Sequence, residues 1–183
     1  MPGLTIYQQS EFPSIYKWQA IAFMRMEWTS IFYDDNLYMS ETYPPEFQPV
    51  HFVMAEEDSL LSYATLLKLN IPHVGIDYQT YGFGNLLTFP PYRKRGYGGQ
   101  ILQAATDFIK ESHVDVAILF CDPLLEAFYA AKGWVVTRSP TCLGTPDQYQ
   151  EYAPSRMMLF VSEKGQRGKI DFETQPLYLD SPW

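Results

Sequence analysis

The sequence is poor in cysteine, in long apolar runs and in basic residues, and each shortage excludes a class of protein. Its two cysteines, Cys121 and Cys142, are too few for a disulfide framework. No apolar run approaches the roughly 20 residues that cross a bilayer. The start, MPGLTIYQQSEF, lacks the pattern of a signal peptide. We therefore expect a cytoplasmic protein with no membrane partner.

Positive charge is scarce as well. The chain has 13 lysines and arginines against 21 acidic residues, which gives a formal charge of -8 and a pI of about 4.8. Nucleic acids need a broad basic face, so we expect no nucleic-acid partner, whereas a cationic partner suits the acidic balance. The three histidines, His51, His73 and His113, lack metal-ligand spacing, so no metal is expected.

Length and composition favour one globular domain. The chain has 183 residues, of which 46% are hydrophobic and 16% aromatic, enough apolar material for a sizeable core. We expect a single domain over residues 1–183, acting as a monomer or a homodimer.

The hydrophobic pattern predicts a helix, then antiparallel strands, then alternating strands and helices, which is the mixed α/β class. The expected helices are 12–32, 101–109 and the segment between Asp122 and Gly133. The expected strands are 51–57 and 59–71 (with a tight turn at Asp58), the later part of 73–89 (after a loop), 114–122, 134–136 and 156–162. The segment before residue 156 is predicted as a polar loop and 163–183 as a polar tail.

One stretch, PPYRKRGYGGQIL at residues 90–102, concentrates both positive charge and glycine. A strand that ends at such a turn and restarts as a helix directs free backbone N–H groups, and the positive end of the helix dipole, toward one point. Glycines allow a ligand to approach the backbone closely. The turn lacks the P-loop pattern, and GxGxxG fails because Ile101 stands at the last glycine position. These residues alone are about equally compatible with a phosphate-binding site and with an ordinary basic turn whose charges are solvated.

Two motifs in this order resemble the GCN5-related N-acetyltransferases (GNAT). Residues 93–98, RKRGYG, fit the family's R/Q-x-x-G-x-G/A signature, and residues 127–134, AFYAAKGW, are similar to its F-Y-x-x-x-G-F/W segment. The resemblance covers 51–136 and is weak over the first 50 residues. It implies a mixed, mostly antiparallel central sheet flanked by helices, with a splay between the fourth and fifth strands.

The resemblance also implies an activity, the direct transfer of an acetyl group from acetyl-CoA to an amine. The implied cofactor-binding residues are Leu86, Leu87 and Thr88 for the pantetheine arm, and Arg93, Lys94, Arg95, Gly96, Tyr97, Gly98 and Gly99 for the pyrophosphate. Tyr129 matches the family tyrosine that protonates the departing thiolate, a step open to a phenol of ordinary pKa near 10. By its neighbours alone, Tyr129 is also compatible with a role in the core.

A narrower likeness, to aminoglycoside 2′-N-acetyltransferases, rests on residues 129–141 and on the final Asp-x-x-Trp. It implies that the tail 163–183 lines the acceptor site through Asp180 and Trp183. The acceptor would be a small cationic amine, aminoglycoside-like or polyamine-like.

The sequence leaves the general base, the function class and the acyl group open. Many family members carry a glutamate base on the fourth strand, but Gly84, next to Asn85, stands at that place here. The base is therefore unassigned, and a catalytically silent acyl-CoA-binding sensor or partner module is the main alternative. A third possible function is a protein N-terminal or lysine acetyltransferase. The use of acyl groups other than acetyl also stays open.

Overall fold

The computed structural model describes the backbone of residues 1–183 and every side chain except that of Asp35. The chain forms two compact units, which we describe in turn. The first comprises Met1–Leu67 and Asn85–Ala105, and the second comprises Lys68–Gly84 and Thr106–Trp183. Three elements contribute residues to both units, namely β3 (Ser59–His73), β4 (Ile76–Thr88) and α2 (Tyr97–Lys110).

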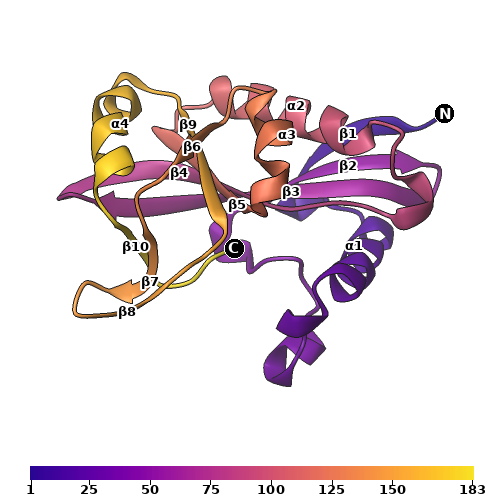
Figure 1. Cartoon of the computed structure of the whole chain (residues 1–183). Coiled ribbons are helices and arrows are strands. Elements are labelled where there is room, and N and C mark those ends of the chain that lie inside the picture. Colours follow the sequence, from indigo (N-terminus) through magenta and orange to yellow (C-terminus); the bar gives the residue numbers. More distant parts are fainter. The chain divides into compact units, whose positions relative to one another are not determined.

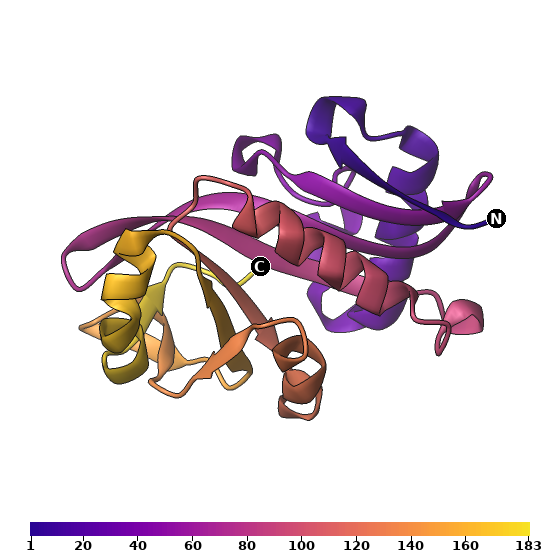
Figure 2. The same cartoon turned by 90° about the horizontal axis from the view of Figure 1, so that it is seen from above.

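The first unit has strands in the order β1-β2-β3-β4, with helices on both faces. Strands β1 (Gly3–Gln8) and β2 (Val50–Glu56) are antiparallel, and so are β2 and β3. Helix α1 (Ser14–Glu27) lies on one face and the start of α2 on the other (Figures 1 and 2). Short 3₁₀ helices complete the unit: η1 (Gln9–Glu11), η2 (Thr29–Ile31), η3 (Asp34–Tyr38), η4 (Pro45–Phe47) and η5 (Pro90–Tyr92).

The core of this unit forms where α1 meets the strands. Ala20 and Met24, one turn apart on α1, pack against Val53, Tyr63 and Leu87 from three strands. The predicted tight turn at Asp58 is confirmed, since Glu56 pairs with Ser59 across the hairpin. The buried face of α1 is formed by Ala20, Ile21 and Met24, whereas the apolar Ile15 and Trp18 of the same helix are exposed.

The second unit continues β3 and β4 and adds strands in the order β3-β4-β5-β9-β6. Strand β5 (Val116–Cys121) is parallel to β4, whereas β9 (Ser155–Phe160) is antiparallel to both β5 and β6 (Val135–Thr137). A smaller sheet has the order β10-β7-β8, formed by β7 (Thr141–Thr145), β8 (Gln148–Glu151) and β10 (Leu177–Leu179). The helices are α3 (Glu126–Ala130), preceded by η6 (Pro123–Leu125), and α4 (Glu163–Thr174). A mixed, mostly antiparallel sheet with flanking helices confirms the predicted fold class.

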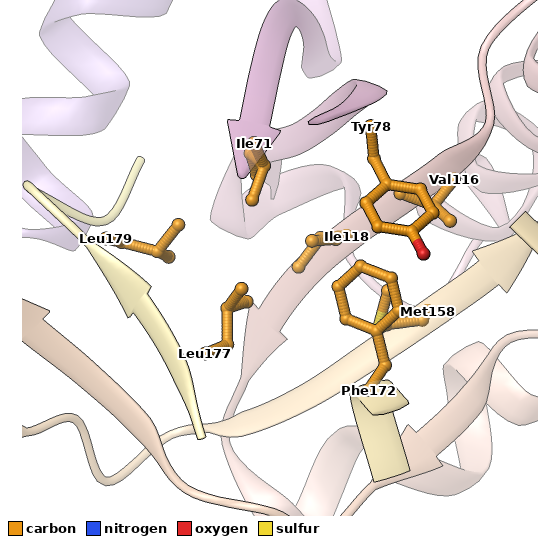
Figure 3. Packing of buried hydrophobic residues seen from close by; sticks show 8 residues of the cluster. All are labelled: Ile71, Tyr78, Val116, Ile118, Met158, Phe172, Leu177 and Leu179. Carbon is orange, nitrogen blue, oxygen red and sulfur yellow. The ribbon is translucent and has the colours of Figure 1, made fainter. Parts of the chain in front are cut away.

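Helix α4 covers the core of the second unit, which Figure 3 shows. The ring of Phe172 meets that of Tyr78 edge-on, at 5.0 Å between centroids, and Leu177 and Leu179 of β10 join the same cluster. Gly168 allows this approach, because a Cβ atom there would lie 2.2 Å from the Tyr78 hydroxyl oxygen. The polar helix is therefore held by its glycine and aromatic positions.

The sequence prediction is wrong in three places. Residues 73–89 hold no loop, because Val74 and Gly75 form a turn between β3 and β4, both with positive φ (49° and 74°). Such turns favour asparagine and glycine, so Val74 hides the signal. The polar loop before residue 156 contains the hairpin β7–β8, and the polar tail contains α4 and β10. Strand β1 was not predicted.

No helix in the described part of the chain has the length and apolar character to cross a membrane.

Candidate active site

The glycine-rich turn of the first unit presents a run of backbone donors. Lys94 and Gly96 have positive φ values of 64° and 80° between η5 and α2. Among the backbone hydrogen bonds of the described residues, none has its donor in residues 94–99, and Gln100 is the next N–H to find a carbonyl, that of Gly96 at 3.1 Å. Because these donors gather at the N-terminus of a 14-residue helix, an anion there would be stabilised by hydrogen bonds and by the helix dipole.

The three cations of the turn have different environments. Arg93 donates through Nε to the Thr88 carbonyl oxygen at 2.9 Å and pairs through Nη2 with Glu27 Oε2 at 2.6 Å. The Arg95 guanidinium lies over the Tyr92 ring, 5.5 Å from its centroid. Among the described side chains, Lys94 has no ion-pair partner. Lys94 and Arg95 therefore offer an anion more free charge than Arg93 does.

The end of β4 lies against the same turn. Thr88 Oγ1 is 2.8 Å from Ser62 Oγ, and Ser62 also donates to the Leu87 carbonyl oxygen at 2.6 Å. A Cβ atom on Gly98 would lie 3.4 Å from Thr88 Oγ1. The structure thus brings together two parts of the predicted cofactor site, the end of β4 and the glycine turn. Ser62 of β3 holds the end of β4 through hydrogen bonds to Leu87 and Thr88.

A cavity of about 120 Å³ opens at this place. It is lined by the predicted Leu87, Thr88 and Arg93, and by Phe23, Met26, Glu27, Phe89 and Pro90, which were not predicted. The rings of Phe23 and Phe89 are stacked 4.4 Å apart. Helical spacing predicts a helix over residues 12–32, of which Ser14–Glu27 forms α1, but nothing in the sequence tells which of its residues face β4.

The middle of β4 is irregular where many family members carry a base. The parallel register with β5 ends at Phe83 and Leu119, one residue before Gly84, as the predicted splay requires. Asn85 follows with a φ of 56°, the left-handed conformation that accompanies a bulge in a strand. Its side-chain nitrogen is buried and has no hydrogen-bond partner among the described residues. Neither Gly84 nor Asn85 offers a group that takes up a proton at neutral pH.

Tyr129, the predicted proton donor, lies in the second unit on α3. Only 7% of it is exposed, and its ring meets Phe83 and Phe128 edge-on, at 6.4 and 5.1 Å. Burial, together with the nearby Cys121, raises the pKa of the phenol above its usual value of 10. Tyr129 is therefore protonated at neutral pH, the state that a proton donor requires, and the same burial also fits a core residue.

The two residues predicted to contact the acceptor differ in their surroundings within this unit. Trp183 packs on Gly82, and its ring is 5.2 Å from that of Phe120. Asp180 is exposed. In the described part of the chain, no group of three or more His, Cys, Asp and Glu side chains converges on one point.

These features match a known family. A sequence model described as "Acetyltransferase (GNAT) domain" matches residues 5–137. The chain belongs to the GNAT acetyltransferase family. It is accordingly an acyltransferase, and the GNAT match includes both motifs on which the resemblance rested. No curated protein sequence matches the chain.

Solved structures share the GNAT fold at low identity. An acyl-CoA N-acyltransferase from Pseudomonas aeruginosa is 15% identical with a TM-score of 0.60, over 86% of this chain and 99% of that one. The GNAT family N-acetyltransferase YhbS from Escherichia coli, in complex with CoA, is 16% identical with a TM-score of 0.61, over 97% and 90%. An aminoglycoside 6′-N-acetyltransferase complexed with coenzyme A is 13% identical with a TM-score of 0.59, over 86% and 97%.

Proposed function

We propose that this GNAT domain transfers the acetyl group of acetyl-CoA directly to a primary amine of a small, cationic acceptor, aminoglycoside-like or polyamine-like. The observation that carries this proposal is the run of backbone N–H groups at residues 94–99, at the start of α2, for which the described residues supply no backbone acceptor. Two structural relatives crystallised with CoA support the choice of coenzyme.

Each predicted residue has a role in this mechanism. The N–H groups of residues 94–99, with the charges of Lys94 and Arg95, hold the pyrophosphate of acetyl-CoA. The backbone of Leu86, Leu87 and Thr88 pairs with the pantetheine arm, and a backbone N–H of this segment stabilises the thioester oxyanion. Both contributions come from the first unit.

The chemical step replaces one acyl bond with another. The amine nitrogen forms a bond to the acetyl carbon, the carbon–sulfur bond breaks, and Tyr129 gives its phenolic proton to the departing thiolate. Because neither Gly84 nor Asn85 can take the proton of the amine, that proton leaves through water. Tyr129 regains a proton from solvent, which completes the cycle.

The acceptor side rests on charge and on the end of the chain. The tail 163–183 lines the acceptor site through Asp180 and Trp183, and the net charge of -8 steers a cation toward the protein. Residues 1–183 act as a single N-acetyltransferase domain in the cytoplasm, as a monomer or a homodimer, without a nucleic-acid partner.

The test is the release of CoA thiol from acetyl-CoA across a panel of aminoglycosides, polyamines, amino acids and a peptide. We expect release with polycationic amines, and a loss of at least tenfold in kcat for Tyr129→Phe with acetyl-CoA affinity unchanged. The matched control is Tyr149→Phe, which alters an exposed tyrosine of the same unit and should leave kcat unaltered. Equal kcat for wild type and Tyr129→Phe would remove Tyr129 from the mechanism.

A second candidate is a catalytically silent acyl-CoA-binding module. It is favoured by the absence of an acid at Gly84 and Asn85. Tight acetyl-CoA binding with no thiol release for any amine of the panel would select this candidate instead.

A further inference from the structure

Three aromatic rings from distant parts of the sequence meet in the second unit. Phe120 is the central ring, with Tyr152 edge-on to it at 5.2 Å and 84°, and Trp183 tilted against it at 5.2 Å and 53°. All three side chains are half-buried. We call Phe120, Tyr152 and Trp183 the aromatic triad.

Local structure explains how the triad forms. Phe120 is the next-to-last residue of β5, and the N–H of Tyr152 donates to the Thr141 carbonyl oxygen at 2.8 Å, which fixes the chain just after β8. Trp183 lies close to β4 at Gly82, where the absence of a side chain leaves room for its ring. Each ring is thus placed by a different strand.

The triad differs from the other aromatic contacts of the protein. Cations lie over five other rings, those of Trp18, Phe32, Tyr92, Tyr78 and Phe160. Among the described residues, no lysine or arginine of the chain lies over a ring of the triad. The faces that stay in contact with solvent are therefore free for a cation from outside.

The indole N–H of Trp183 differs from that of Trp134 in its hydrogen bonding and, as a donor, leaves cation binding to the faces of the rings. Its nitrogen is buried and has no partner among the described residues. Trp134, in the core of the same unit, does bond through its indole nitrogen, to Thr106 Oγ1 at 3.0 Å. Trp183 is held by ring contacts and not by a hydrogen bond.

We propose that the aromatic triad binds an ammonium group of the acceptor other than the amine that is acetylated. Aromatic faces attract an ammonium ion electrostatically, because the ring face carries partial negative charge. Half-buried rings suit this role, because they shield the cation partly from water. The inference rests on the proposed function, and it narrows the acceptors to compounds that carry at least two positive groups.

A binding experiment tests the triad without any turnover. Tetramethylammonium chloride is titrated calorimetrically into the protein at constant ionic strength, with tert-butanol as a neutral compound of similar shape. We expect binding of the cation and not of the alcohol, a loss of at least fivefold in affinity for Trp183→Leu, and a smaller loss for Trp183→Phe, which keeps a ring in place. Tyr149→Leu, an exposed aromatic residue outside the triad, is the matched control and should bind as the wild type does.

A kinetic comparison then links the triad to the acceptor. We expect 1,4-diaminobutane to have a KM at least fivefold below that of n-butylamine, and Trp183→Leu to abolish this difference. Equal binding of tetramethylammonium by wild type and Trp183→Leu, or no binding at all, would overturn the proposed ammonium-binding role of the triad, even if thiol release is normal. Triad-dependent binding of tetramethylammonium without thiol release for any amine would instead overturn the proposed function, and with it the assignment of the ammonium group to an acceptor.

Discussion

The indole ring of Trp183 lies so close to Gly82 that a Cβ atom at residue 82 would come within 2.7 Å of Trp183 Cε2 and 2.9 Å of Nε1. Gly82 has an ordinary strand conformation, since its φ is not positive, so the absence of a side chain serves packing and not backbone freedom. Trp183 is thereby held against β4 within the second unit.

We expect Gly82→Ala to displace Trp183, because contacts below 3.0 Å between carbon atoms are not tolerated. Acrylamide should quench tryptophan fluorescence more strongly in the variant, and its affinity for tetramethylammonium should fall at least threefold. Gly3→Ala is the control, since a Cβ atom there would meet no heavy atom within 4 Å. Quenching equal to that of the wild type would show that the ring does not depend on Gly82.

The glycine turn makes a prediction about charge. We expect Gly98→Asp to weaken acetyl-CoA binding more than tenfold by calorimetry, because it places a carboxylate where the pyrophosphate is proposed to bind. Gly98→Asn has nearly the same shape without the charge and should lose much less affinity. An aspartate in the first turn of α2 favours the helix, so a loss of binding would not reflect unfolding. Equal affinities for the two variants would contradict an anion site at this turn.

Arg156 makes a prediction about stability. Its buried guanidinium donates to Thr137 Oγ1 at 2.7 Å, to Ser139 Oγ at 2.6 Å and to the Phe172 carbonyl oxygen at 2.8 Å, near the end of α4. Burial lowers its pKa to about 10, so it stays charged at neutral pH.

We expect Arg156→Lys to lower the free energy of unfolding by about 2–3 kcal/mol in urea, because an ammonium group cannot replace the fork of donors. Arg138→Lys is the matched control, since that side chain is 72% exposed in its pair with Glu126. It should cost less than about 0.5 kcal/mol. Similar losses for both variants would mean that the hydrogen bonds of Arg156 add little.

His51 makes stability depend on pH. Its ring is fully buried in the first unit, with Nδ1 at 2.7 Å from the Tyr63 hydroxyl oxygen and Nε2 at 2.7 Å from Gln9 Oε1, and burial lowers its pKa to about 3. Below pH 6.5 the unfolded chain takes up a proton here that the folded protein does not. This contribution to stability is therefore complete above pH 6.5 and is lost as the pH falls toward 3.

The linkage gives a measurable difference. Between pH 7 and pH 5, the wild type should lose about 2 kcal/mol more of its free energy of unfolding than His51→Gln does, by chemical denaturation at each pH. His73, whose pKa is also lowered by burial, is present in both proteins, so its effect cancels in the comparison. Parallel pH profiles would contradict a neutral, buried His51.

Local signals in the sequence predicted the parts of the fold that local physics decides. Helix α2 has a clear apolar stripe and β5 is a continuous apolar run. The segment expected to be helical after Asp122 begins with η6, where the Asp122 carboxylate accepts from the Leu124 N–H at 2.8 Å. The glycine turn is equally visible in the sequence, because its glycines and its run of basic residues mark an unusual backbone geometry.

The missed elements depend on distant contacts. Helix α4 is polar along most of its length and is held by Gly168 and Phe172 against Tyr78, a residue far away in the chain. The wall that Phe23 and Met26 add to the cavity depends on how α1 is rotated on β4. The two partners of such a contact lie far apart in the sequence, so local sequence patterns cannot predict the contact.

The ion pair between Arg93 and Glu27 has a consequence for how acetyl-CoA binding responds to salt. In the free protein the turn already holds an anion of its own, the Glu27 carboxylate at 2.6 Å from Arg93 Nη2. A phosphate that recruits Arg93 must displace this carboxylate. Added salt weakens the incoming contact and the existing one together, because both are partly exposed. Affinity should therefore fall less steeply with ionic strength than three cations in a row would imply.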